Sequence, residues 1–375
     1  MTILIAGCPC GAGNIGDDAI LEGMLRTIRI ISPDIIIKVS SWNPVLTQEM
    51  FKNYDITAIY AQSNKRILYE MFFSGAVIVG GGTLVDDSYD GLAFPINHTV
   101  KFLKMAKWLR KKVFIYAIGA NALHSQRARN LVRKYYAKTA IITTRDDQSK
   151  QVMKGLGIND VSVLRDPAFT IDPLDEASAK KILRLRGIEK SEGSPLIGVS
   201  VMNEKMKKVF RYKVEIAKAC DFLIEKYKAQ IVFVAHECRP SMDIAAIRET
   251  IEHMKNEPLI LSKENYHPRE MAGMIKCFDL TIGMRMHFLI LSAVAHVPFI
   301  AISRIDKVNN FMRLFGVAPV GHIDEVQSQD IIAEAERILQ DKSAYKTRIK
   351  EGLDKILKES EGSTNLLKGF LSSKK

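Results

Sequence analysis

The feature that most constrains the fold of this chain is the alternation of apolar, strand-like runs with segments of helical period. In the first half, the apolar runs lie at residues 2–7, 35–40, 57–60, 76–79, 113–118, 140–143 and 161–164. Amphipathic helices are predicted between them, most clearly at residues 17–31, 99–109 and 125–138. Repeated strand–helix units with short connections predict a mostly parallel sheet covered by helices on both faces.

The alternation restarts after a charged helix and a turn at Glu192-Gly193-Ser194-Pro195. Strands are predicted at residues 196–201, 230–235, 259–261, 278–282 and 299–302, and helices at 212–227, 242–255, 268–275 and 288–295. A chain of 375 residues fits two domains. We therefore predict an α/β fold of two doubly wound, Rossmann-like domains facing a cleft, with ligands at the carboxyl ends of the strands. The expected domains are residues 1–175 and 190–340, followed by a helical tail at 341–375.

Bulk composition narrows the class of protein. The chain is 47% hydrophobic, but no apolar run approaches the ~20 residues that span a bilayer. The first seven residues resemble a strand and lack the basic segment of a signal peptide, so a cytoplasmic location is expected. Five cysteines, an odd count without zinc-type spacing, argue against a disulfide framework and predict no metal site.

The net charge is +12, with 54 Lys and Arg against 42 Asp and Glu. Much of the excess lies in predicted helices, including residues 101–112 and 205–213, where a solvated face is the default explanation. The charge also suits anionic small molecules, phosphate-linked substrates or peripheral contact with an anionic membrane surface. No RNP-like pattern, zinc finger or aromatic-rich basic arm is present, so nucleic acid is not predicted as a partner.

The first loop, Gly11-Ala12-Gly13-Asn14-Ile15-Gly16, matches G-x-G-x-x-G between a strand and a helix. A dinucleotide site also needs an acid after the second strand, but residues 40–44 contain none. Asp17 and Asp18 follow the loop and would repel a pyrophosphate, whereas they suit helix capping and hydroxyl binding. We predict that this loop binds a sugar or a small anion. A structural tight turn is the alternative.

Three further strand ends carry polar or glycine-rich segments. Gly80-Gly81-Gly82-Thr83 allows close backbone approach to a ligand. Arg145 could reach a carboxylate or phosphate, although a surface ion pair explains it equally well. His236, with Glu237, Arg239 and Asp243 close behind, could move protons or serve only as a structural hydrogen-bonding residue.

The segment Gly283-Met284-Arg285-Met286-His287 lies where a predicted strand meets a helix. Such a junction directs backbone N–H groups and the positive end of the helix dipole outward. A guanidinium and an imidazole added there predict a phosphate or carboxylate site at which protons can also move. No G-x-S-x-G elbow, Walker A loop or H-E-x-x-H motif is present, which removes common hydrolase, nucleoside triphosphatase and zinc-protease functions.

Taken together, these segments resemble the polysaccharide pyruvyl transferase family. The matching segments are Gly13-Asn14-Ile15-Gly16-Asp17-Asp18-Ala19-Ile20, Gly80-Gly81-Gly82-Thr83-Leu84, Arg145-Asp146-Asp147-Gln148-Ser149, Asp166-Pro167-Ala168-Phe169, Gly283-Met284-Arg285-Met286-His287, and Val297-Pro298-Phe299-Ile300-Ala301-Ile302 with Asp306-Lys307-Val308. The resemblance implies a fold like the glycosyltransferase-B architecture. It also implies transfer of a pyruvyl group from phosphoenolpyruvate, as co-substrate without another cofactor, to hydroxyls of a sugar in a cell-surface polysaccharide or its lipid-linked precursor.

The resemblance also assigns roles to residues of this chain. It implies that His287 is the acid that protonates the donor, and that Asp17 or Asp18 acts on the acceptor hydroxyls. From the resemblance and the strand-end residues together, the predicted substrate-binding residues are Arg285, Arg145, Gly13, Asn14, Gly16, Gly81, Gly82, Thr83, His236 and Lys307. The acceptor is expected on the N-terminal domain and phosphoenolpyruvate on the C-terminal domain. A nucleotide-sugar glycosyltransferase or epimerase of the same architecture and a sugar-binding protein without turnover are the alternatives, and the oligomeric state stays open.

Overall fold

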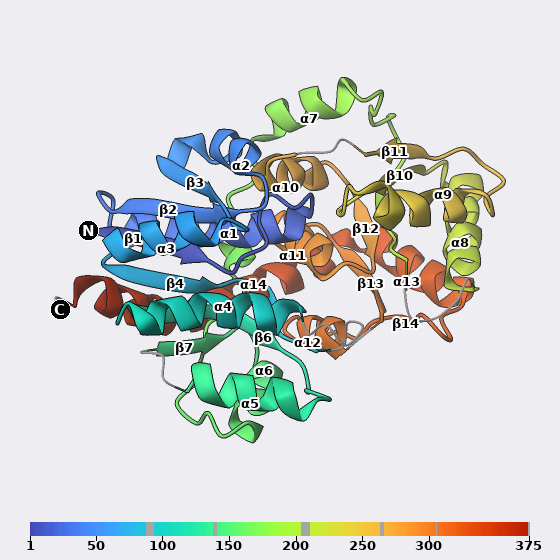
Figure 1. Cartoon of the computed structure of the whole chain (residues 1–375). Helices are drawn as coiled ribbons and strands as arrows, with labels where there is room; N and C mark the ends of the chain where they lie inside the picture. Colours follow the sequence, from blue (N-terminus) through green and yellow to red (C-terminus); the bar gives the residue numbers. More distant parts are fainter. Residues whose placement is uncertain (88–93, 138–140, 204–210, 263–265, 305, 374–375) are drawn as a thin grey trace. The chain divides into compact units, whose positions relative to one another are not determined.

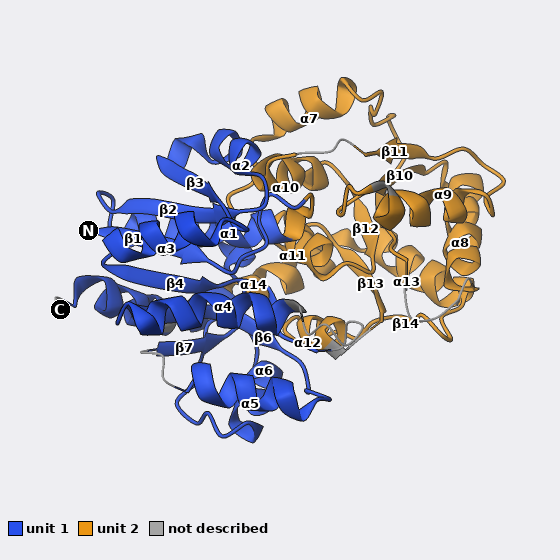
Figure 2. Ribbon diagram, in the orientation of Figure 1, with its two compact units in different colours: residues 1–12, 17–170, 356–375 blue, residues 13–16, 171–355 orange. Residues whose placement is uncertain are grey.

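The structure of the protein, a computed structural model, describes residues 1–87, 94–137, 141–203, 211–262, 266–304 and 306–373. The chain forms two compact units (Figure 1, Figure 2). Unit 1 comprises Met1–Ala12, Asp17–Thr170 and Ile356–Lys375, and unit 2 comprises Gly13–Gly16 and Ile171–Lys355. The loop Gly13–Gly16 thus packs with unit 2, although the residues on both sides of it belong to unit 1.

Unit 1 is built on a parallel sheet. Along the sheet the strands are β3 (Ile56–Tyr60), β2 (Ile36–Ser41), β1 (Thr2–Ala6), β4 (Ala76–Gly80), β6 (Lys112–Ala120), β7 (Ile141–Thr144) and β8 (Ser162–Val163), and the short β5 (Thr83–Val85) pairs with β6. The central strands β1 and β4 are buried and rich in β-branched residues, as expected for a sheet covered on both faces.

Helices cover both faces of this sheet (Figure 1). They are α1 (Ile15–Ile31), α2 (Pro44–Met50), α3 (Asn64–Phe73), α4 (Phe94–Trp108), α5 (Gln126–Tyr135) and α6 (Asp147–Gly155). Residues of α3 and α4 such as Ile67 and Phe102 share one apolar core with Val77 and Val79. Residues of α1 share the opposite core with Ile3, Ile5 and the C-terminal Leu367. In β4, Val77 and Val79 enter the first core whereas Ala76 and Ile78 enter the second, because alternate side chains of a strand point to opposite faces of the sheet.

Unit 2 contains a second parallel sheet with the order β11 (Leu259–Leu261), β10 (Gln230–Val234), β9 (Leu196–Ser200), β12 (Leu280–Gly283), β13 (Phe299–Ser303) and β14 (Gly321–His322). Its helices are α7 (Glu176–Arg184), α8 (Arg211–Tyr227), α9 (Ala245–Ile251), α10 (Pro268–Lys276), α11 (Met286–Val294), α12 (Asp306–Arg313) and α13 (Ser328–Gln340). The last helix, α14 (Lys342–Ser372), begins in unit 2 and ends in unit 1. The α/β fold with two parallel-sheet domains is confirmed.

Several elements differ from those predicted. Helices α2, α3 and α12 and strands β5 and β14 were not predicted. The helix expected at residues 242–255 is instead a π-type turn, Pro240–Ile244, followed by α9, because Met242 has a non-helical backbone. Residues 171–189 pack with unit 2, where Leu174 lies against Gly273 of α10. Of the predicted basic segment 205–213, residues 205–210 lie outside the described residues.

Candidate functional site

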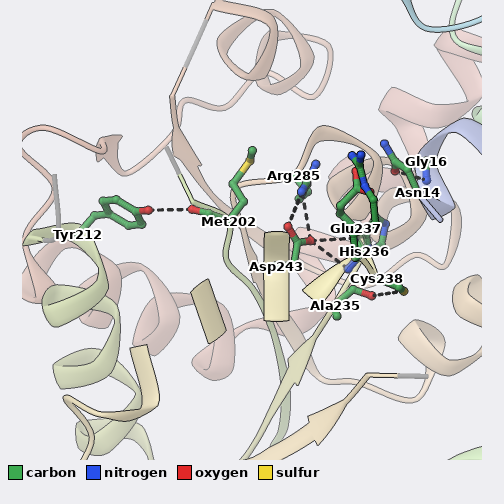
Figure 3. Close-up of polar contacts among 11 residues, drawn as sticks. Asn14, Gly16, Met202, Tyr212, Ala235, His236, Glu237, Cys238, Asp243 and Arg285 are labelled. Carbon is green, nitrogen blue, oxygen red and sulfur yellow. Dashed lines mark hydrogen bonds and ion pairs between the residues drawn. The ribbon is translucent and has the colours of Figure 1, made fainter. Parts of the chain in front are cut away.

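The carboxyl edge of the unit 2 sheet gathers segments that are far apart in the sequence (Figure 3). Residues 235–238 follow β10, and Arg285 and His287 follow β12, where Arg285 is the N-cap of α11. The glycine loop Gly13–Gly16 joins the same edge through an antiparallel bridge between Asn14 and Glu237. We call this arrangement the edge site. It brings together predicted site residues Gly13, Asn14, Gly16, His236, Arg285 and His287.

Backbone hydrogen bonds bind the glycine loop to the segment after β10. Ile15 N–H donates to His236 O at 3.0 Å, and Cys238 N–H donates to Gly13 O at 2.9 Å. Asn14 Oδ1 accepts the Gly16 N–H at 2.9 Å. In a dinucleotide site such loop N–H groups would face the pyrophosphate. Here the N–H groups of Ile15 and Gly16 are engaged within the protein, which argues against a dinucleotide site.

Gly16 lies directly against the ring of His287. A Cβ atom at Gly16 would approach His287 Nδ1 to 2.4 Å, so only glycine leaves room for the imidazole in this position. His287 lies in the first turn of α11, where backbone N–H groups have no partner within the helix itself. The loop thus holds one side of the imidazole that the sequence predicts to be the acid.

Asp243 fixes the orientation of Arg285. Arg285 Nε lies 3.1 Å from both carboxylate oxygens of Asp243, and Nη2 also contacts Oδ1. Asp243 is completely buried, and its Oδ2 accepts the backbone N–H groups of His236 at 3.1 Å and Glu237 at 2.9 Å. Among the described residues, Nη1 of Arg285 donates no hydrogen bond, so this side of the guanidinium remains available to an anion.

His236 is the most unusual polar group of the edge site. It is 1% exposed, and neither ring nitrogen has a hydrogen-bond partner among the described residues. Its ring packs edge-on against Phe288 with centroids 5.5 Å apart. Burial lowers the pKa of His236 well below its usual value, and the charges of Arg285 and His287 add to this effect. The ring is therefore neutral at pH 7 and offers one donor and one acceptor.

Two buried hydroxyls lie at the same edge. Ser200 ends β9 and Ser303 ends β13, on either side of β12, and neither Oγ has a partner among the described residues. Because buried polar groups normally form hydrogen bonds, these two hydroxyls can serve as donors or acceptors at this edge. These two serines could not be predicted as site residues, because a single Ser at the end of an apolar run carries no distinctive signal. Asp243 was noted only as a nearby carboxylate.

Arg145 occupies a different environment, inside unit 1. It is 6% exposed, and its Nη2 donates to Thr83 Oγ1 at 2.8 Å. Asp146 and Asp166 lie 3.5 and 3.7 Å from its guanidinium. These contacts compensate the buried charge and tie the end of β7 to β5, so Arg145 does form ion pairs, but in a buried environment and not at the surface as the alternative expected. Substrate binding by Arg145 and Thr83 stays a prediction.

The second glycine segment packs tightly against α1. Gly81 and Gly82 both have positive φ angles, and a Cβ at Gly81 would meet Ile20 at 2.4 Å. Gly81 N–H donates to Tyr116 O at 3.0 Å, and Gly82 O accepts the Gly119 N–H at 2.8 Å. Close packing accounts for these glycines, and their contact with substrate stays a prediction.

The two acids after the first loop differ. Asp18 is 4% exposed, and its Oδ1 accepts the Gly11 N–H at 2.9 Å, which stabilises the turn after β1. Asp17 is partly buried, and its Oδ1 lies 3.7 Å from the position of a Cβ at Gly82. Lys307 is partly buried in the first turn of α12. The roles of all three in the reaction stay predictions.

Within the described ranges, no cluster of three His, Cys, Asp or Glu side chains could hold a metal ion. No helix in the part of the chain that the structure describes is long and apolar enough to cross a membrane.

Structural comparison defines the fold. UDP-GlcNAc 2-epimerase from Neisseria meningitidis, bound to UDP-GlcNAc, matches with a TM-score of 0.63 and 12% identity over 100% of both chains. HepE from Anabaena, in complex with UDP and glucose, matches with a TM-score of 0.61 and 10% identity over 98% of this chain and 99% of its own. Heptosyltransferase II from E. coli matches with a TM-score of 0.52 and 13% identity over 92% and 100%. The fold is glycosyltransferase-B-like.

Sequence comparison then identifies the family. The model of the polysaccharide pyruvyl transferase family matches residues 14–306, and the chain belongs to this family of transferases. A search of curated protein sequences gave no significant match. The matched region contains every segment of the edge site except Gly13.

Proposed function

We propose that the protein transfers a pyruvyl group from phosphoenolpyruvate to two hydroxyls of a sugar in a cell-surface polysaccharide or its precursor, forming a pyruvate ketal and releasing phosphate. The observation that carries this proposal is the Arg285–His287 segment at the N-terminus of α11, with the guanidinium held by Asp243. Family membership supports the same reaction.

The edge site suits the donor because phosphoenolpyruvate carries both a phosphate and a carboxylate. Nη1 of Arg285 and the backbone N–H groups that begin α11 are charge-assisted donors for one of these anions. The neutral ring of His236 and the hydroxyls of Ser200 and Ser303 offer further hydrogen bonds. When the donor displaces water from this site, the effective dielectric constant falls and each of these contacts becomes stronger.

The chemistry requires a proton at one carbon and nucleophiles at its neighbour. His287, when protonated, donates its proton to the methylene carbon of the donor, and the oxygen of the first sugar hydroxyl bonds to the adjacent carbon. The bond from that carbon to the phosphate oxygen then breaks, and Arg285 stabilises the leaving phosphate. A second hydroxyl attacks the same carbon and closes the ketal. The proton of one sugar hydroxyl returns to His287 and replaces the proton that His287 gave to the methylene carbon. The proton of the other hydroxyl leaves with phosphate.

We assign the binding and activation of the acceptor hydroxyls to the two acids after the first loop, Asp17 and Asp18. We propose that Asp17 orients or deprotonates them, and that Asp18 holds the turn after β1, where its Oδ1 accepts the Gly11 N–H.

Phosphate release and glycan mass test the function together. Incubation with phosphoenolpyruvate and a candidate glycan should release phosphate only when both are present, and mass spectrometry should show the glycan gaining one pyruvyl ketal. A nucleotide released from a UDP-sugar, with phosphoenolpyruvate left intact, would instead identify a nucleotide-sugar enzyme. Sugar binding without turnover, unaffected by Arg285→Ala, would identify a binding protein.

A further inference from the structure

An exposed aromatic cluster lies on α3 and α4 of unit 1. Tyr69, Phe72 and Phe73 at the end of α3 are 56%, 58% and 59% exposed, and Trp108 at the end of α4 is 72% exposed. The rings of Tyr69 and Phe73 lie 4.8 Å apart, and those of Phe72 and Phe73 lie 5.1 Å apart. Single exposed apolar residues are ordinary, but a group of large aromatic rings in water marks an interaction surface.

The sheet topology brings the two helix ends to one edge. Helix α3 ends just before β4 and α4 ends just before β6, and these parallel strands pair with Ala76 opposite Lys112. Lys111 connects the two ends directly, because its Nζ donates to Phe72 O at 2.6 Å and to Ser74 O at 2.8 Å. This is the edge at which the strands begin. The basic end of the segment 101–112 thus lies at the opposite end of these strands from Gly81 and Gly82, which follow β4.

The charge around the cluster is almost entirely positive. Residues 64–73 and 101–112 contain eight Lys and Arg but one acid, Glu70. Glu70 is buried and forms ion pairs with Lys38 and Arg66, so it adds little negative charge at the surface. Lys104 and Lys107 are exposed on α4 beside Trp108. We name the four aromatic residues and the exposed cations Lys104, Lys107 and Arg110 the aromatic–basic face.

We propose that the aromatic–basic face docks on an anionic lipid membrane. Tyr, Trp and Phe enter the boundary between head groups and acyl chains, while Lys and Arg remain among the anionic head groups. A second copy of the chain is a poorer occupant, because it would place the same cations against each other. The membrane contact thereby uses residues other than those of the edge site, so the inference does not depend on the proposed reaction.

Vesicle sedimentation tests the surface. The full chain should pellet with vesicles of equal parts phosphatidylglycerol and phosphatidylcholine at low salt, and not with phosphatidylcholine alone. Binding should fall as the Debye length shortens from about 10 Å at 0.1 M salt to about 3 Å at 1 M. The triple variant Phe72→Ser, Phe73→Ser, Trp108→Ser should lose at least about tenfold in vesicle affinity, because three apolar side chains no longer enter the boundary. Val45→Ser with Leu185→Ser, which changes two equally exposed residues elsewhere, is the matched control and should bind normally.

Tryptophan fluorescence gives a second readout that does not depend on the triple variant folding. The chain has two tryptophans, so Trp42→Phe leaves Trp108 as the single reporter. Its emission should shift to the blue on anionic vesicles and stay unchanged on neutral ones. An unshifted emission together with no pelleting overturns the proposal, as does normal binding by a folded triple variant. A concentration-dependent dimer that the triple variant abolishes, without vesicle binding, would assign the face to a second copy instead. Phosphate release with a water-soluble glycan should be unaffected throughout.

Discussion

Arg285 and Asp243 form a forked ion pair in which Nε of the guanidinium lies 3.1 Å from both oxygens of a completely buried carboxylate. Two backbone N–H groups, from His236 and Glu237, complete the hydrogen bonding of the same carboxylate. Asp243 therefore positions the cation that we assign to the donor, and at the same time fixes the segment that holds the glycine loop.

A double-mutant cycle tests this pair. Arg285→Ala should weaken phosphoenolpyruvate binding by about 2–3 kcal/mol, roughly 30- to 150-fold, because a charge-assisted contact is lost. It should also lower the free energy of unfolding by about 3 kcal/mol, because Asp243 is left as an unpaired buried charge. Adding Asp243→Asn should restore part of that stability without restoring binding. Calorimetry and urea unfolding measure the two effects.

The single variant Asp243→Asn tests whether Asp243 positions Arg285 for the donor or competes with the donor for it. It keeps an acceptor for the backbone N–H groups but loses the ion pair, so we expect the KM for phosphoenolpyruvate to rise about tenfold. A lower KM would show instead that Asp243 mainly competes with the donor for Arg285.

Gly16→Ala should disturb His287. The added methyl would lie 2.4 Å from Nδ1, so the ring must shift, at a cost of about 1–3 kcal/mol and with a lower kcat. The double variant Gly16→Ala, His287→Ala should recover the lost stability but not the activity. Gly155→Ala, where no atom lies within 4 Å of the new Cβ, is the control and should leave both unchanged. Unaltered kcat in Gly16→Ala would show that the position of the ring is not critical.

Acid should destabilise the protein through His236. Burial lowers the pKa of this imidazole in the folded state, so below pH ~6.5 the unfolded chain binds a proton that the folded chain does not. Stability therefore falls as the pH drops below that value, by up to about 1.4 kcal/mol per pH unit for one such group. The half-buried His98 and His267, each with a pKa of about 4, contribute in the same direction. Urea unfolding between pH 5 and 8 gives the slope of the unfolding free energy against pH, which measures the protons taken up on unfolding. His236→Phe should reduce that uptake by about one proton at acid pH. An unchanged slope contradicts this account.

Asp17→Ala and Asp18→Ala should have different effects. Asp17→Ala should impair use of the sugar acceptor while phosphoenolpyruvate binding stays nearly intact. Asp18→Ala should instead lower the free energy of unfolding by about 1–3 kcal/mol, because the Gly11 N–H loses its acceptor. Acceptor kinetics and thermal unfolding of both variants distinguish these roles, and full acceptor activity in Asp17→Ala would exclude it from the reaction.

The local pattern of the sequence was sufficient to predict most strands of the two sheets. The apolar runs that became β1, β4, β9 and β13 are buried on both faces, so their composition alone sets them apart. Helix α3 was not predicted, because three of its large aromatic residues face water and obscure the amphipathic period. The turn at Pro240–Ile244 was predicted as helix, because apolar periodicity carries no information about the hydrogen bonds of Asp243.

The sequence by itself determined the family, the alternation of strands and helices, and the presence of Arg285 and His287 at a strand–helix junction. Only the tertiary structure decided which residues surround them. Asn14 meets Glu237, Gly16 meets His287, and Asp243 meets Arg285, although each pair is separated by tens to hundreds of residues. The physical reason is that secondary structure follows from neighbours within one or two turns of the chain. The partners of a buried charge or ring depend instead on which strand ends meet at one edge of a sheet.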